Sequence, residues 1–414
     1  MRRLLVAVAV SIGMSTAAEA QRPAAQLPEG PEKALTEAVC TTCHTADLIT
    51  TSSGYTRDEW RIVMRTMVDL PEGPAARISE YLGASFPPNT RRAPTLVPGD
   101  EVVAFREWRV PTLGQRSRDP IEAQDGSIWW TGQYGNLVGR IDPRTGAMKE
   151  YPLPSGARPH TVVEDRDGFI WYTGNANATI GRLDPKTGEV TVFPMPDPSA
   201  RDPHSAIFDA KGILWFTLQQ SNMAGRLDPA SGEIKLFPLP TKGSRPYGIQ
   251  VDSRGTPWIG FNGANVLATI DPQTLEVRQF TLPNPAARPR RIAVDSRDRI
   301  WYADTRGYLA RFDPATGEVR EWPSPSGPRS SPYAIAIVND IVWYNESGMR
   351  PDVLVRFDPA TETFQSWPIP SWGIHAGIIR HMDVTRDGNL VIHQSSTNSI
   401  SLVEIGRRSR SPSQ

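Results

Sequence analysis

Two cysteines and a histidine stand at a spacing that suits one particular covalent chemistry. Cys40 and Cys43 are the only cysteines among the 414 residues, and His44 follows the second one directly. C-x-x-C-H is the attachment motif of c-type haem. The two thiols form thioethers with the macrocycle, and the imidazole binds the iron from one side. A redox dithiol would not need the histidine, and a zinc site would need four ligands. We therefore predict one covalent haem c, held by Cys40, Cys43 and His44.

A methionine could bind the other side of the iron. Trp60, Met64 and Met67 lie on one apolar stripe at helical spacing. A methionine ligand leaves no coordination position open and favours electron transfer over reaction with oxygen. The segment resembles short c-type cytochromes, in which a tryptophan, six residues and a methionine precede a glycine loop and a Tyr-Leu pair. Gly73 and residues 81–82 complete that pattern, so we predict Met67 as the ligand. The alternatives are Met64, or two methionines that only fill a core.

Helices must position these groups. Residues 31–39 predict a helix that leads into the cysteine motif, and Thr56 to Glu59 is a capping box that opens another. A third short helix should follow and end at Gly83. We predict a small all-α cytochrome c-like domain over residues 27–86.

The N-terminus predicts export. Arg2 and Arg3 precede an apolar run, and small residues follow it, so residues 1–20 are interpreted as a signal peptide and the mature chain should begin near Gln21. The run is short for a membrane span, and no membrane span is expected after cleavage. We expect a periplasmic protein. Residues 87–100 are proline-rich and predict a semi-rigid linker.

The rest of the chain repeats every 42 to 44 residues. Two landmarks share this period: a tryptophan in an Ile-Trp-type strand and an Asp-Pro turn. The tryptophans are Trp129, Trp171, Trp215, Trp258, Trp301 and Trp343. Four short strands with turn residues between them fit in each unit, which is typical of a β-propeller blade. Because an aromatic repeated in every unit is typical of packing, we assign the tryptophans to the core between blades.

We predict a seven-bladed all-β propeller with four-stranded blades over residues 101–405. A seventh inner strand appears at residues 390–392 without a tryptophan. Residues 107–111 look like a fourth strand without its first three, and residues 400–405 look like a third strand without its fourth. Pairing them would close the ring with an N-terminal strand and remove a free sheet edge. Residues 406–414 are expected to be a basic, flexible tail.

One position of the repeat varies while its surroundings do not. It follows the residue that opens the first strand of each unit, and its occupants are Arg118, His160, His204, Tyr247, Arg290, Tyr333 and Arg380. Equivalent positions of a propeller surround its axis, so these side chains would line one opening. Such a ring suits an anionic ligand, because arginine pairs well with carboxylate. The alternative is that these side chains only cap strand ends.

The repeat resembles the virginiamycin B lyase (streptogramin lyase) family through its I-W-[FYW]-T, G-R-[IL]-D, F-P-[LM]-P and x-P-[HY] elements. The resemblance implies a seven-bladed propeller whose lyases open a cyclic depsipeptide with a histidine base, a substrate-binding histidine and magnesium on two glutamates. His204 matches the base, His160 matches the substrate-binding histidine, and Asp202 matches the first glutamate. Leu218 or Gln219 takes the place of the second, which weakens the case for Mg²⁺.

The balance of charges bears on which class of partner the protein could bind. The 45 basic and 45 acidic residues cancel, so we expect no nucleic-acid partner. The leading hypothesis is electron transfer through haem, with a redox partner protein, coupled to binding or oxidation of a small anionic molecule at the propeller axis. Whether the chain is an enzyme is left open, with an oxidoreductase preferred to a lyase. The alternatives are a carbon–oxygen lyase that uses His204 and His160 with a metal, and a non-enzymatic docking propeller.

Overall fold

The computed structural model describes residues 26–42, 46–51, 54–88, 92–371 and 379–407. The predicted signal peptide at residues 1–20 lies outside these ranges, as do Cys43, His44 and residues 408–414 of the predicted tail. Within the described residues, no helix combines the length and the apolar composition that crossing a bilayer requires.

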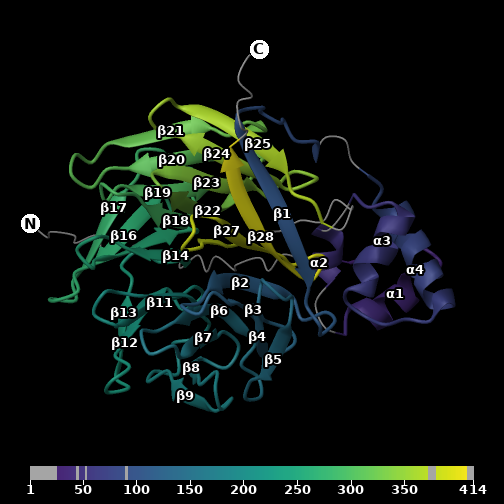
Figure 1. Ribbon diagram of the computed structural model, residues 1–414, viewed down its shortest axis with the longest axis horizontal. Coiled ribbons are helices and arrows are strands. Elements are labelled where there is room, and N and C mark those ends of the chain that lie inside the picture. The colour runs from purple at the N-terminus through teal and green to yellow at the C-terminus, as the bar shows by residue number, and fades with distance from the viewer. Residues whose placement is uncertain (1–25, 43–45, 52–53, 89–91, 372–378, 408–414) are drawn as a thin grey trace, which may run out of the picture.

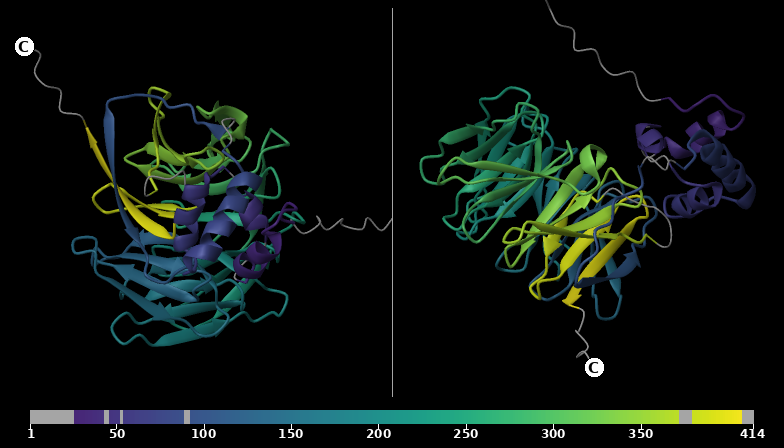
Figure 2. Two further views of the ribbon diagram at one scale, coloured as in Figure 1. Left: turned by 90° about the vertical axis from the view of Figure 1, so that its right-hand side faces the viewer. Right: turned by 90° about the horizontal axis from the view of Figure 1, so that it is seen from above.

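Four helices form the N-terminal part of the described chain and pack beside the propeller (Figures 1 and 2). They are α1 (Lys33–Cys40), α2 (Ala46–Thr51), α3 (Arg57–Arg65) and α4 (Glu72–Ser85). The capping box is confirmed: Thr56 accepts from the backbone N–H of Glu59, and the Glu59 carboxylate accepts from the backbone N–H of Thr56 at 2.7 Å. The structure shows this helical segment, whereas its identity as a cytochrome domain stays a prediction.

The expected helix end at Gly83 is wrong, because α4 continues to Ser85. Gly83 instead allows two helices to approach each other. A Cβ atom at this residue would come within 3.0 Å of the backbone nitrogen of Arg57 at the start of α3. The glycine is thus required by packing between α3 and α4, which a local sequence pattern does not reveal.

Seven four-stranded antiparallel sheets follow, each in meander order, as the sequence predicts (Figure 1). The innermost strands are β2 (Ser117–Glu122), β6 (Pro159–Glu164), β10 (Pro203–Phe208), β14 (Pro246–Val251), β18 (Pro289–Val294), β22 (Pro332–Val338) and β26 (Met382–Val384). The second strands are β3 (Ile128–Gly132), β7 (Ile170–Gly174), β11 (Leu214–Leu218), β15 (Pro257–Phe261), β19 (Ile300–Asp304), β23 (Ile341–Glu346) and β27 (Leu390–Gln394).

The two outer strands of each blade complete the sheets. The third strands are β4 (Leu137–Ile141), β8 (Thr179–Leu183), β12 (Met223–Leu227), β16 (Val266–Ile270), β20 (Tyr308–Phe312), β24 (Val353–Asp358) and β28 (Ser399–Arg407). The fourth strands are β5 (Met148–Pro152), β9 (Val190–Pro194), β13 (Ile234–Pro238), β17 (Val277–Thr281), β21 (Val319–Pro323), β25 (Thr363–Pro368) and β1 (Glu101–Arg109). A short 3₁₀ helix, η2 (Gly327–Arg329), precedes β22. We number the blades one to seven from β2, β6, β10, β14, β18, β22 and β26.

The seventh blade is closed by the N-terminal strand of the propeller, as predicted. β1 pairs antiparallel with β28, with Trp108 opposite Ile400. The pairing is longer than expected, since it begins at Glu101 and β28 continues to Arg407, two residues beyond residue 405. The long strand β1 lies beside β28 in Figure 1. Closure pairs the edge of β28 that would otherwise be free.

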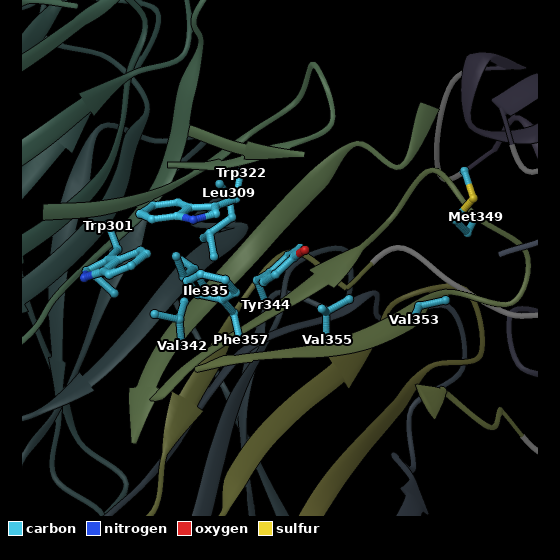
Figure 3. Close-up of a cluster of buried hydrophobic side chains, with 12 residues drawn as sticks. Trp301, Leu309, Trp322, Ile335, Val342, Tyr344, Met349, Val353, Val355 and Phe357 are labelled. Atoms are coloured by element: carbon cyan, nitrogen blue, oxygen red, sulfur yellow. The ribbon is translucent and has the colours of Figure 1, made fainter. Parts of the chain in front are cut away.

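The repeated tryptophans form the core between neighbouring blades, as predicted. Trp301 of blade five stacks on Trp322 with ring centroids 5.3 Å apart and lies 5.9 Å from Phe357 of blade six. Figure 3 shows these rings with Val342 between the sheets. The Trp301 indole N–H donates to Asp295 of the preceding turn at 2.8 Å, so this buried polar atom is satisfied.

The described part of the linker is hydrogen-bonded to blade six. Val97 and Ser366 exchange hydrogen bonds, with the Val97 N–H donating to Ser366 Oγ and the Ser366 N–H donating to the Val97 carbonyl, both at 2.8 Å. Thr95 donates to Ser326, and the backbone N–H of Arg350 donates to the Arg92 carbonyl. These bonds attach the segment that joins the helices to the propeller.

Candidate functional site

The structure brings the seven variable side chains together at the inner strands. Ring centroids of His160 and His204 are 3.6 Å apart, and His204 lies 4.3 Å from Tyr247. The hydroxyl groups of Tyr247 and Tyr333 are hydrogen-bonded, and the guanidinium of Arg290 lies 3.7 Å from the centre of the Tyr333 ring. The ring positions of five consecutive blades therefore form one continuous arc of planar groups.

A β-bulge at the start of the innermost strand positions each of these side chains. In blade two, Pro159 pairs with Gly174 but Val162 pairs with Tyr172, so β6 carries one extra residue, and the same shift recurs in blades one and three to six. A bulge turns two consecutive residues toward one side of the sheet. His160 and the residue after it, Thr161, are both buried.

The bulge produces a second tier of side chains that the sequence analysis missed. It contains the residues that directly follow the predicted ring, and those that carry chemistry are Asp119, Thr161, Ser205 and Arg291. His381 holds the same place in blade seven, directly before β26. The alternation of an ordinary strand would have pointed them away from the axis. The x-Pro pair before most of these strands is the local signal that could have suggested the irregularity.

Threonines of the second strands hold the ring of one blade against the next. Thr173 Oγ1 donates to the carbonyl of His204 at 2.9 Å and accepts from the backbone N–H of Thr161 at 3.0 Å. Thr131 and Thr217 make the corresponding bonds to the carbonyls of His160 and Tyr247. The threonine of the repeated I-W-x-T element therefore has a structural role in fixing the ring.

The side chain of Arg291, directly after ring residue Arg290, contacts groups from several blades. Arg291 of blade five donates to Asp119 of blade one at 2.8 Å, to Ser205 of blade three at 3.0 Å and to the Arg380 carbonyl before blade seven at 3.0 Å. Asp119 also accepts from the Thr161 hydroxyl at 2.8 Å. Burial opposes ionisation of Asp119, but the charge of Arg291 holds its pKa well below the usual range. This buried pair joins opposite sides of the propeller.

Four further arginines gather above this pair, and none has a carboxylate within 4.0 Å in the described part of the chain: Arg116, Arg118, Arg290 and Arg380. Arg118 donates to Gln133 at 2.9 Å, yet within the described ranges its Nε has no hydrogen-bond partner, and neither does Nε of Arg290. Burial, followed by the charges of Arg118 and Arg290, lowers the pKa of Arg380, against the opposing effect of Tyr333 and Tyr247. Buried positive charge without a counterion is costly, so this arrangement suits an anion.

The two predicted catalytic histidines are neutral at neutral pH. Burial, followed by the charge of Arg118, lowers the pKa of His160 to about 3, and burial holds the pKa of His204 well below its usual value. Nε2 of His160 has no hydrogen-bond partner in the part of the chain that the structure describes. Both imidazoles can accept a proton or a hydrogen bond but do not add positive charge.

Asp202 does not belong to a group of metal ligands in the described residues. Its carboxylate accepts from the backbone N–H of Gln220 at 2.9 Å, and burial raises its pKa to about 6. Leu218 is fully buried in β11. No cluster of three or more histidine, cysteine or acidic side chains suited to a metal occurs among the residues described.

A cavity of about 160 Å³ lies between the helices and the propeller. Cys40, Trp60, Met64 and Met67 line it on the helical side, together with aliphatic side chains. The propeller side is more polar and contains Arg116, Tyr134, Arg380, Ser395, Ser396 and Asn398. Both candidate methionines therefore reach the cavity, and Arg380 connects it to the ring.

The helical segment and the propeller contact each other through backbone as well as side-chain atoms. The N–H of Gly114 donates to the Thr66 carbonyl at 2.9 Å, directly after α3. A Cβ atom at Gly114 would come within 2.8 Å of the Met67 carbonyl oxygen. Cys40 is half-buried, and burial raises the pKa of its thiol to about 11. The loop before β2 thus fixes the propeller next to the predicted haem ligands.

The comparisons with known proteins agree with this propeller. A solved streptogramin B lyase is 25% identical, with a TM-score of 0.66 over 73% of this chain and 98% of that chain. Virginiamycin B lyase from Staphylococcus aureus is 24% identical, with a TM-score of 0.65 over 73% of this chain and 99% of that chain. A catalytically inactive variant of that lyase, solved with quinupristin, is 25% identical, with a TM-score of 0.64 over 72% of this chain and 99% of that chain.

No curated protein sequence matches the chain. The model of the virginiamycin B lyase family matches residues 98–357, more than half of the chain, from the end of the linker to the third strand of blade six. With its seven four-stranded blades, this chain belongs to the virginiamycin B lyase family.

Proposed function

We propose that this chain is a periplasmic c-type haem protein whose propeller binds a small anionic molecule at its axis. Electron transfer to a redox partner protein would be coupled to binding or oxidation of that molecule. The haem, when bound, supplies a one-electron donor and acceptor. The remaining functions belong to side chains of this chain.

One observation carries the proposal: the cavity that Cys40, Met64 and Met67 reach is also lined by Arg380, a member of the axial ring. Cys40 of the haem-attachment motif and Arg380 of the ring therefore line the same cavity, although they are 340 positions apart in the sequence. A ligand of the ring would lie next to the predicted haem, which is the arrangement that electron exchange between them requires.

The described residues fit a haem. The described helical wall of the cavity is apolar, as the macrocycle requires, and it contains a buried indole N–H of Trp60 that has no partner among the described residues. Cys40 and Cys43 would form the thioethers, and His44 and Met67 would bind the iron. Cys43 and His44 lie outside the described residues, so the fit rests on Cys40, the methionines and the cavity wall.

The propeller residues would bind and orient the anion. Arg118 and Arg290 have free donors for a carboxylate or another oxyanion, and neutral His160 and His204 can accept hydrogen bonds from its hydroxyl groups. The pair of Arg291 and Asp119 would form the floor below the ligand. Because these groups are desolvated, their attraction for an anion is stronger than at the surface.

The test is spectroscopic. The full-length protein, purified from a periplasm with haem maturation, should show covalent haem bands that sharpen on reduction. Addition of candidate anionic substrates to the oxidised protein should reduce the haem with at least one of them, and Arg118→Gln should slow that reduction. A colourless protein contradicts the proposal. A coloured protein whose haem no anionic molecule reduces or perturbs contradicts the role of the propeller axis.

The sixth ligand can be assigned with the same preparation. Met67→Ala should abolish the absorption band of methionine ligation, while Met64→Ala should retain it, because the sequence pattern places the ligand at Met67. The opposite result would assign the iron to Met64.

A second candidate is a carbon–oxygen lyase, which family membership and the contact between His160 and His204 favour. A neutral His204 is in the protonation state that a general base requires. His204→Ala should then abolish opening of a lactone-containing peptide in the presence of magnesium. Unchanged turnover in this variant, or no turnover in the parent protein, counts against this candidate.

A further inference from the structure

The propeller wall of the cavity carries two arginines, Arg116 and Arg380, that form no ion pair with a carboxylate of the described residues. Arg116 donates to the hydroxyl of Tyr134 and lies 4.9 Å from the centre of that ring. Arg380 makes its described hydrogen bonds through its backbone, with its N–H donating to His393 and its carbonyl accepting from Arg291. Both guanidinium groups remain available to an occupant of the cavity.

The electrostatics of this pair indicate that a counterion is missing. Burial, followed by the charges of Arg380 and Arg118, lowers the pKa of Arg116 to about 9. Arg116 therefore still carries its charge at neutral pH, next to other cations. Asp119 cannot neutralise it, because that carboxylate already binds Arg291. An occupant with negative charge would remove the repulsion.

The opposite wall restricts what the occupant can be. Among the residues described, it is formed by Val63, Val68 and Leu82 with Trp60 and the two methionines, and none of its described side chains is charged. A small free anion would satisfy the arginines but leave this apolar surface uncovered. An occupant with an apolar body and carboxylates at one end satisfies both walls.

We infer that Arg116 and Arg380 bind the carboxylate groups of the haem that the helical segment carries, so that the propeller holds the haem across the boundary between the two parts. The inference rests on the proposed function, because it requires the covalent haem. It adds a task for propeller residues that neither the attachment motif nor the lyase-like repeat implies.

Two consequences follow for the haem. Positive charge near the iron stabilises the reduced form, which carries one positive charge less than the oxidised form, so both arginines should raise the reduction potential. They should also link docking of the helical segment to haem attachment, since the carboxylates would connect α1 to blades one and seven.

The experiment measures the midpoint potential of the full-length haem protein in a zwitterionic buffer. We expect Arg116→Gln and Arg380→Gln each to shift the equilibrium toward the oxidised form on the order of tenfold, which is about 59 mV for one electron. Arg116→Lys and Arg380→Lys keep the charge and should keep most of the potential. Arg158→Gln is the matched control, because Arg158 lies 5.9 Å from the same Tyr134 ring but is exposed and does not line the cavity.

Other outcomes overturn the inference. If both glutamine variants keep their haem bands and have the same midpoint potential as the parent protein, that result contradicts this inference and leaves the proposed function standing. A shift that appears only when succinate or inorganic phosphate is added would assign the arginines to a free anion. If a glutamine variant unfolds, the lysine variants decide. Lysine keeps the positive charge, so a lysine variant whose midpoint potential falls as far as expected for loss of that charge contradicts the inference. A colourless parent protein would contradict the proposed function as well.

Discussion

Arg291 and Asp119 form a buried ion pair at 2.8 Å that joins blade five to blade one across the propeller. The same guanidinium also contacts Ser205 and the carbonyl of Arg380, so one side chain binds groups from blades three and one and from the start of blade seven. The pair closes the inner end of the ring of Arg118, His160 and the other variable residues. Of the ring residues, Arg380 also lines the cavity beside the helices.

Loss of Arg291 should destabilise the propeller strongly. Arg291→Gln leaves the Asp119 carboxylate buried without its cation, which typically costs about 3–5 kcal/mol. The midpoint of urea unfolding, followed by tryptophan fluorescence, measures the loss. Arg320→Gln is the control, because its pair with Glu362 is half-exposed and should contribute about 0–1 kcal/mol. An Arg291→Gln variant as stable as this control would show that the pair is not essential to the ring.

Stability should fall as the pH drops from about 6.5 toward 4. The folded pKa of His160 is lowered to about 3 and that of His204 lies well below its usual value, so the unfolded chain takes up protons first. The stability from keeping them neutral is complete above the unfolded pKa and is lost as the pH falls. Asp202 and Asp383, whose pKa values burial raises to about 6, oppose this change.

The midpoints of urea unfolding at pH 7.5 and pH 5 test whether stability falls as the pH is lowered. The parent protein should unfold at lower urea at pH 5, and the double variant His160→Asn with His204→Asn should show a smaller difference between the two pH values. An equal midpoint at both pH values in the parent protein would exclude a dominant contribution of the buried imidazoles.

The axial arginines should determine anion affinity. Arg118→Gln and Arg290→Gln each remove a charged donor whose Nε has no partner in the described residues, and we expect roughly tenfold weaker binding for each. Titration calorimetry with succinate and with inorganic phosphate provides the measurement. Arg278→Gln, on the exposed surface of β17, should bind as the parent protein does. Equal affinity in all three variants would place the anion elsewhere.

Magnesium should not stabilise this protein through Asp202. Its carboxylate binds the backbone N–H of Gln220, and buried Leu218 supplies no second ligand. The melting temperature should therefore be the same with and without magnesium, while Asp202→Ala should cost about 0.5–1.5 kcal/mol because the N–H of Gln220 loses a part-buried hydrogen bond. A magnesium-dependent rise in melting temperature that disappears in Asp202→Ala would support the lyase instead.

Much of the fold could be predicted from the sequence because a propeller repeats local interactions. The spacing of the tryptophans from Trp129 to Trp343 gave the blades, and the incomplete strands at the two ends predicted the closure that β1 and β28 form. Trp301, for example, satisfies its indole N–H within its own turn and packs against the next blade. Each of these contacts recurs at a fixed offset, so a period reveals them.

The sequence by itself determined the number of blades, the seven variable positions and the C-x-x-C-H spacing of Cys40, Cys43 and His44. The tertiary structure alone decided that Arg291 meets Asp119, 172 residues apart, and that Cys40 and Arg380 line one cavity. The physical reason is that bulges turn a second residue of each inner strand toward the axis, and ring closure brings distant blades together. The bulge recurs with the repeat, but the contacts it permits join residues of distant blades at no fixed offset along the chain, so no sequence period contains them.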